Sequence, residues 1–151
     1  GVRNVKGELI LPTEYEEPTM DENKRRGMST NFGIWWDGDL LRELLDHETV
    51  QKYDWKTGRV NVIKRFDGRF NNGTKSNPCL SGDILGDWRE EVLVRDAQST
   101  MLKLYTTDIP TDHRITCLMQ DVPYRLSIAT ENVAYNQPPE PGFYLGVGIK
   151  K

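Results

Sequence analysis

The segment 50–66, VQKYDWKTGRVNVIKRF, constrains the fold more than any other part of the sequence. Its side chains alternate with a period of two on both sides of Lys56-Thr57-Gly58. Alternation of this kind is typical of β-strands, and a Gly-containing turn between two such segments is suited to a tight reversal of the chain. The segment therefore predicts an antiparallel β-hairpin.

Further strand signals follow one another along the chain. Residues 32–36 (FGIWW) form an apolar and aromatic run that ends at the turn sequence Asp37-Gly38-Asp39. The next residues, LLRELLD, have a periodicity that a helix could share, but their short length and the preceding turn favour a second hairpin strand. Residues 90–96 and 101–107 predict another hairpin. Residues 114–121 fit a strand or a short helix equally, and LSIATEN (126–132) is expected to be a strand.

Composition supports a turn-rich β protein with a thin core. The chain of 151 residues suits one domain, only 36% of it is hydrophobic, and it contains 13 glycines and 8 prolines. The net charge is −3 with lysines and arginines dispersed, so no basic stripe points to nucleic acid. No apolar run reaches the ~18 residues of a membrane span, and no signal peptide is visible. Cys79 and Cys117 match no metal motif, and free thiols are favoured over a disulfide.

The acidic segment 81–92, SGDILGDWREEV, is a candidate metal loop. Asp83, Asp87 and Glu91 are spaced around Gly86 immediately before an apolar strand. Spaced carboxylates on a tight turn can surround Ca²⁺ with oxygen ligands at ~2.3–2.6 Å. The pattern is similar to the D-x-N-G-D-G-x-x-D loops of integrin-like propeller blades, except for Leu85 and Trp88. The alternative is a structural turn whose acids face water or pair with arginine. An exposed β-turn is the default interpretation of Asp37-Gly38-Asp39, and a metal site is the alternative.

The segment 69–77, RFNNGTKSN, concentrates polar side chains in one short loop. Its amides, hydroxyls and the Lys75 ammonium could bind a polyhydroxylated, carboxylated ligand, and Gly73 would let a sugar ring approach the backbone. Because Asn-Gly is also a favoured tight turn, a plain turn is the alternative.

Five motifs in the same order and spacing resemble the C-terminal region of rhamnogalacturonan lyases of polysaccharide lyase family 11. They are FGIWWDGDLLRELLD, NNGTK, GDILGDWREEV, YTTDIPTDHR and NVAYNQPPEPGFYLG. The resemblance covers about residues 30–148, and VRNVKGELI looks like a strand of a preceding blade.

The resemblance implies an all-β fold, with about two C-terminal blades of an eight-bladed β-propeller that is incomplete as an isolated chain. Residues 1–11 would be a remnant strand of the preceding blade, 12–29 a polar loop or linker, and 30–151 the C-terminal blades. It further implies an extracellular or periplasmic enzyme that binds calcium and cleaves the rhamnose–galacturonic acid backbone of pectin by β-elimination. The expected partners are a pectic oligosaccharide and either the remaining blades or another copy of the chain.

The resemblance also implies roles for single residues. Asn72, Gly73, Thr74 and Tyr135 match positions that hold the sugars, and Lys75 matches a lysine implicated in the chemistry. A cationic Lys75 would stabilise the carboxylate and the developing anion, and a desolvated one with a lowered pKa would act as the base. The family's partner arginine cannot be aligned to Lys64, Arg65 or Arg69. The alternative function is a non-catalytic carbohydrate-binding or structural propeller fragment.

Overall fold

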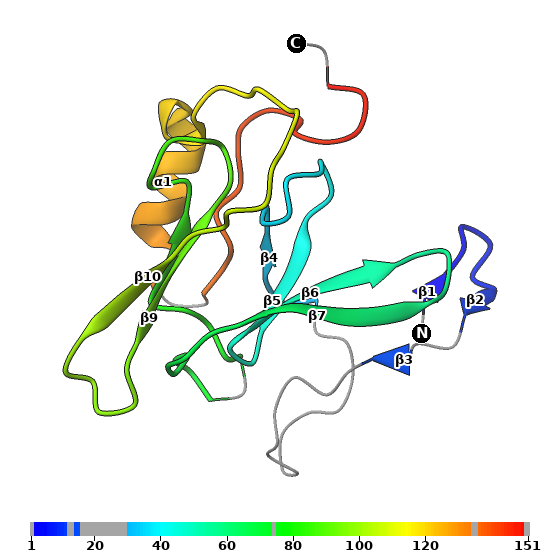
Figure 1. The fold of residues 1–151 in the computed structure, drawn as a ribbon. Helices are drawn as coiled ribbons and strands as arrows, with labels where there is room; N and C mark the ends of the chain where they lie inside the picture. Colours follow the sequence, from blue (N-terminus) through cyan, green and yellow to red (C-terminus); the bar gives the residue numbers. More distant parts are fainter. Residues whose placement is uncertain (1, 12–13, 16–29, 74, 134–135, 150–151) are drawn as a thin grey trace.

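The computed structural model describes residues 2–11, 14–15, 30–73, 75–133 and 136–149, which are mostly β-sheet with one α-helix (Figure 1). A five-stranded sheet has the strand order β3-β7-β6-β5-β4, a three-stranded sheet has the order β10-β9-β8, and β1 pairs with β2. The strands are β1 (Val2–Arg3), β2 (Leu9–Leu11), β3 (Glu14–Tyr15), β4 (Gly33–Ile34), β5 (Glu43–Asp46), β6 (Thr49–Asp54), β7 (Arg59–Arg65), β8 (Leu80–Gly82), β9 (Glu91–Arg95) and β10 (Leu102–Tyr105).

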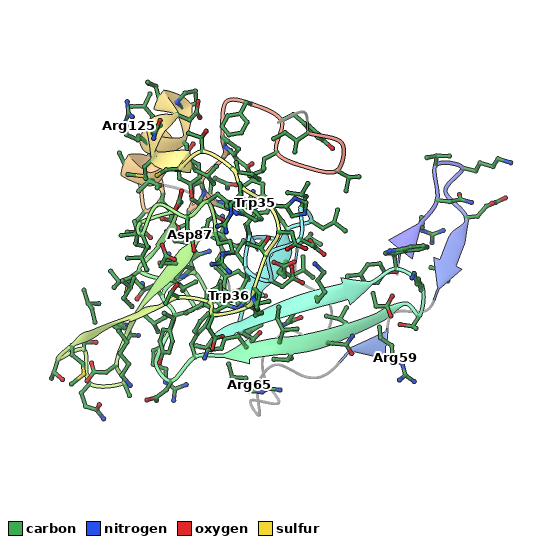
Figure 2. All side chains as sticks on the ribbon, turned by 45° about the horizontal axis from the view of Figure 1, so that its top comes forward. Trp35, Trp36, Arg59, Arg65, Asp87 and Arg125 are labelled. Atoms are coloured by element: carbon green, nitrogen blue, oxygen red, sulfur yellow. The ribbon has the colours of Figure 1, made fainter. Side chains whose placement is uncertain are left out.

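The predicted hairpins are confirmed. Strands β6 and β7 pair antiparallel from Asp54↔Arg59 onwards, with the turn at Gly58 in the left-handed region (φ 74°). Strands β9 and β10 form the second hairpin, and β4 pairs with β5 as the turn after residue 36 suggested. Figure 2 shows Arg59 and Arg65 at opposite ends of β7. Of the predicted linker 12–29, only the two residues of β3 lie within the described part of the chain.

The predicted strand at 126–132 is wrong, because this region belongs to helix α1 (Val122–Thr130). The Asp121 side chain accepts a hydrogen bond from the Tyr124 N–H at 3.0 Å, and Pro123 lies in the first turn. An acceptor side chain before the helix and a proline in its first turn are both favourable at a helix start. Residues 114–121, where a strand and a short helix were equally expected, contain the 3₁₀ turn η1 (Leu118–Gln120).

Two buried clusters form the core. The first lies where strands of the two larger sheets meet, and the second lies beneath α1 and the C-terminal tail. Trp35, Trp36 and Trp88 are buried, whereas Trp55 is 67% exposed. Cys79 and Cys117 are free and half-buried. The first cluster contains Phe32, Ile34, Trp36, Leu45, Val50, Phe66, Phe70, Val92 and Val94, and the second contains Trp35, Trp88, Leu118, Tyr124 and Leu145.

The two larger sheets repeat one structural unit. A shift of 48 residues takes the pair Ile34↔Glu43 of β4–β5 onto Gly82↔Glu91 of β8–β9. The same shift takes Gly38 (φ 87°) onto Gly86 (φ 83°) in the connecting loops. In both units a third strand, β6 or β10, pairs with the second strand. The acidic segments at 37–43 and 85–91 are therefore equivalent loops of a repeat.

Candidate functional site

The polar loop 71–77 is a closed turn. The backbones of Asn71 and Asn77 bond to each other at 2.6 and 3.1 Å, and the Lys75 N–H donates to the Asn72 carbonyl at 2.7 Å. Asn72 (φ 57°) and Gly73 (φ 31°) both lie in the left-handed region. A Cβ atom added at Gly73 would meet nothing within 4 Å, so a ligand can approach the backbone there. The expected tight turn is therefore present, and it leaves open space beside Gly73.

A chain of asparagine amides joins this loop to the segment that precedes the tail. The Asn72 Nδ2 donates to the Asn136 Oδ1 at 2.8 Å, and the Asn136 Nδ2 donates to the Asn132 Oδ1 at 2.6 Å. The Asn132 Nδ2 in turn donates to the Cys79 carbonyl at 2.6 Å. The structure thus brings two of the predicted sugar-binding segments together. Thr74 and Tyr135 lie outside the described residues.

Lys75 is half-buried beside a polar cavity. Its carbonyl accepts a hydrogen bond from the Asn31 Nδ2 at 3.5 Å, and Asn31 also lines a cavity of about 590 Å³. Most of its lining side chains are polar, as in a surface that binds a sugar chain. The cavity is lined by Thr30, Asn31, Ser127, Thr130, Glu131, Val133, Gln137, Pro138 and Glu140.

Glu131 contributes a buried carboxyl group to the wall of this cavity. Its oxygens accept hydrogen bonds from the Ser81 N–H at 3.0 Å and from the Ser81 hydroxyl at 2.7 Å. Burial raises the pKa of Glu131 to about 7, although the bonds from Ser81 act in the opposite direction. The group can therefore change protonation near neutral pH. The sequence did not single out Asn31, Asn136 or Glu131, because their roles depend on contacts between distant segments.

The three carboxylates of the predicted calcium loop are engaged by protein donors. Asp83 accepts hydrogen bonds from the N–H groups of Gly86 at 2.8 Å and Leu118 at 2.6 Å. Glu91 accepts two backbone N–H groups and the Thr106 hydroxyl. Asp87 pairs with Arg89, which is one feature of the alternative structural turn (Asp87 is labelled in Figure 2). Calcium binding by these three residues stays a prediction.

A different acidic group is brought together in the described part of the chain. The carboxylates of Asp37, Asp39 and Glu43 lie within 4.8 Å of one another, close enough that the group could hold a metal ion. The Lys52 Nζ contacts all three, at 2.9, 2.7 and 2.6 Å. Burial raises the pKa of Glu43 to about 7 against the opposing effect of Lys52. Burial alone would lower the pKa of Lys52, but its bonds to the three acids raise it.

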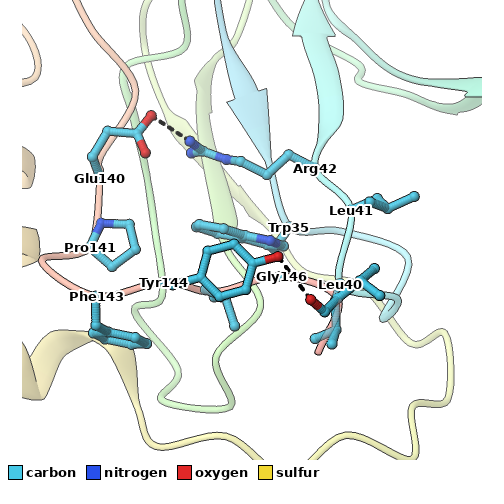
Figure 3. A pocket seen from close by; sticks show the side chains of 11 residues that line it. Trp35, Leu40, Leu41, Arg42, Glu140, Pro141, Phe143, Tyr144 and Gly146 are labelled. Carbon is cyan, nitrogen blue, oxygen red and sulfur yellow. Dashed lines mark hydrogen bonds and ion pairs between the residues drawn. The ribbon is translucent and has the colours of Figure 1, made fainter. Parts of the chain in front are cut away.

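A second cavity, of about 450 Å³, lies against the C-terminal tail (Figure 3). The Arg42 guanidinium stacks over the Trp35 ring at 4.3 Å from its centroid and pairs with Glu140 at 2.6 Å. Tyr144 reaches across the cavity and donates from its hydroxyl to the Val147 carbonyl at 2.9 Å. The described residues of the loop 71–77 line neither this cavity nor the one that contains Asn31, and Glu140 lines both cavities.

In the described part of the chain, no helix has the length and the apolar character that crossing a membrane requires.

Comparisons with known proteins give a consistent result. The family model described as "Rhamnogalacturonan lyase family 11, C-terminal domain" matches residues 13–151. The rhamnogalacturonan endolyase YesW of Bacillus subtilis (strain 168) is 55% identical over 122 residues, which are 80% of this chain and 20% of YesW. The rhamnogalacturonan exolyase YesX of the same organism is 50% identical, over 82% of this chain and 22% of YesX.

A solved structure shares the fold as well as the sequence. The Bacillus licheniformis rhamnogalacturonan lyase PL11 superposes with a TM-score of 0.78 at 55% identity, over 81% of this chain and 21% of that structure. The chain therefore spans about a fifth of the length of the relatives that it matches.

Proposed function

Because this chain belongs to rhamnogalacturonan lyase family 11, as its C-terminal domain, we propose that it forms part of a lyase active site. The reaction is β-elimination in the rhamnose–galacturonic acid backbone of pectin. The observation that carries the proposal is the bond between Asn72 and Asn136, which holds the loop 71–77 against the segment that contains Tyr135. YesW is named an endolyase and YesX an exolyase, so the proposal covers both modes of cleavage.

The proposed roles follow from the needs of the reaction. Removal of the proton at C5 of a uronate leaves negative charge next to the carboxylate, and fixed donors and cations must stabilise that charge. Lys75 serves as the base when neutral, or stabilises the anion when charged. The leaving glycosidic oxygen takes up a proton as the bond to it breaks, and a new double bond forms in the uronate.

Asn72 is proposed to recognise a sugar hydroxyl. Its Nδ2 donates to the side-chain oxygens of Asn77 at 3.3 Å and Asn136 at 2.8 Å, which engages both of its N–H bonds. Its Oδ1 then remains as the atom that a sugar hydroxyl can bond to. Gly73 and Thr74 would add backbone contacts beside it, and Tyr135 a ring contact.

The proposal extends to the whole protein. The 48-residue repeat of the β4–β5 and β8–β9 units is what successive propeller blades would produce. We propose that the parent protein is a secreted β-propeller and that it binds calcium. Asp83, Asp87 and Glu91 are retained as calcium ligands in this proposal, with the ion displacing the present donors.

The test places this chain in a complete enzyme. Residues 13–151 replace the matching C-terminal domain of YesW, and formation of the unsaturated uronate from rhamnogalacturonan is followed by ultraviolet absorbance. Lys75→Ala is expected to lower kcat by about 10²–10⁴-fold, the usual effect of losing a general base or acid. Lys103→Ala, which removes an ion pair with the exposed Asp67, is the control and should keep the parent rate. A Lys75→Ala chimaera with unchanged kcat would contradict the proposed role.

A second function is favoured because the chain covers only about a fifth of the length of its relatives. The chain alone would then bind pectic oligosaccharides without cleaving them. Calorimetry on the isolated chain separates the two functions, since binding without formation of unsaturated uronate supports this second one.

A further inference from the structure

The two loops of the structural repeat have the same internal hydrogen bonds. The Glu43 Oε2 accepts the N–H groups of Trp36 at 2.8 Å and Asp37 at 3.2 Å. Glu91, 48 positions later, accepts the equivalent N–H groups of Ile84 and Leu85, both at 2.9 Å. One buried glutamate in each unit therefore holds the loop that precedes it.

A second pair of bonds repeats as well. The Leu41 N–H donates to the Asp39 Oδ1 at 2.6 Å, and the equivalent Arg89 N–H donates to the Asp87 Oδ1 at 3.1 Å. Together with the glycines at 38 and 86, these bonds show that the two loops share most of their backbone path, although Trp88 has a positive φ (73°) and the equivalent Leu40 does not. Any difference in their side chains can then be compared position by position.

The loops differ at several positions, and two of these differences concern side chains that meet around the glutamate. The first loop has Asp37 where the second has Leu85. Opposite the glutamate, Lys52 of β6 donates to the Glu43 Oε1 at 2.6 Å, and Thr106 after β10 donates to the Glu91 Oε1 at 3.2 Å. The loop with the additional carboxylate is thus also the loop with the ammonium.

The charges explain why these two positions differ together. Three carboxylates within 4.8 Å repel one another strongly when they are partly withdrawn from water. The Lys52 ammonium has three N–H donors, and each of the three acids lies within hydrogen-bonding distance of its nitrogen. In the second loop Leu85 stands in place of Asp37, Asp87 pairs with Arg89, and Glu91 accepts the uncharged Thr106 hydroxyl.

We infer that Lys52 is the resident cation of the first loop and occupies the place that a divalent metal ion would take among Asp37, Asp39 and Glu43. The first loop is therefore a cation site that is occupied by a side chain of the protein itself. This role is independent of the proposed lyase activity, because it concerns how the loop keeps its shape.

Thermal unfolding of the full chain tests this inference. Lys52→Thr is expected to lower the midpoint in the presence of a chelator by about 4–8 °C. Added CaCl₂ should then raise the midpoint of Lys52→Thr more than that of the unchanged chain, because a metal ion can enter the vacated place. An equal response of both proteins to CaCl₂, or an unchanged midpoint in chelator, would overturn the inference.

A double variant and a control complete the test. Asp37→Leu with Lys52→Thr gives the first loop the side chains of the second at these two places and should recover most of the lost midpoint without calcium; a double variant no more stable than Lys52→Thr would also overturn the inference. If the single variant does not fold, a folded double variant still supports the inference. Lys103→Thr breaks the ion pair with Asp67, which is largely exposed, and should neither lower the midpoint much nor create a response to calcium.

Discussion

Glu131 has a carboxyl group that is 2% exposed, and its described hydrogen-bond donors, the N–H and hydroxyl of Ser81, are uncharged. Ionisation inside the protein is costly under these conditions, and the pKa rises from 4.5 to about 7. A pKa that is higher in the folded state means that the folded protein binds the proton more tightly than the unfolded chain does.

We therefore expect the free energy of unfolding to fall as the pH rises. The contribution of Glu131 is fully present below pH 4.5 and is lost as the pH passes about 7, a change of about 3 kcal/mol. Urea unfolding across this range measures it. Glu131→Gln keeps an acceptor for Ser81 and should flatten the profile, whereas the exposed Glu140→Gln should not. A Glu131→Gln profile as steep as that of the unchanged chain would exclude this explanation.

Among the elements, α1 depends strongly on one residue at its start. The Asp121 Oδ2 accepts the N–H of Tyr124 at 3.0 Å and that of Gly142 in the tail at 2.7 Å. It therefore caps the helix and also fastens the tail beside it. Tyr124, in the same turn, is buried and donates from its hydroxyl to the Glu90 carboxylate at 2.7 Å.

Asp121→Ala is expected to destabilise the protein by about 1–2 kcal/mol, at the upper end for a helix cap, since two N–H groups lose their acceptor. The urea midpoint gives the size of the effect, and faster hydrogen exchange at the Tyr124 amide would locate it. Asp112→Ala, at an exposed position without a helix to cap, serves as the matched control. Equal midpoints for both variants would show that the cap is dispensable.

The same helix shows what the sequence could and could not predict. Hairpins β6–β7 and β9–β10 were predictable because alternation and turn residues are local signals. Helix α1 was not predicted: LSIATEN alone suggested a strand, whereas Asp121 and Pro123 together indicate a helix start. The bond from Asn72 to Asn136 spans 64 positions, so only the fold brings these amides together. The 48-residue repeat is not evident in the sequence because few side chains are identical in the two units.

At the scale of the whole molecule, β10 is an edge strand of the three-stranded sheet, with β9 as its partner among the described strands. It exposes Leu102 (60%) and Leu104 (47%). Apolar edge strands pair readily with other strands. In the isolated chain a second copy can cover this edge.

We expect the isolated chain to self-associate as its concentration rises, which sedimentation velocity can measure. Leu104→Lys should weaken association, because a charge on an edge strand opposes pairing. Leu126→Lys, at an exposed apolar position on α1, should leave it unchanged. A monomer at all concentrations would argue against this role for β10.

The repeated unit also limits which replacements its loops can accept. Positions in β4 and β5 have counterparts in β8 and β9 with the same pairing. Exchanging counterparts one at a time, such as Asp37 with Leu85, would separate what the loop backbone tolerates from what its surroundings demand. The repeat thus provides, within one polypeptide, a set of natural sequence variants for the redesign of these turns.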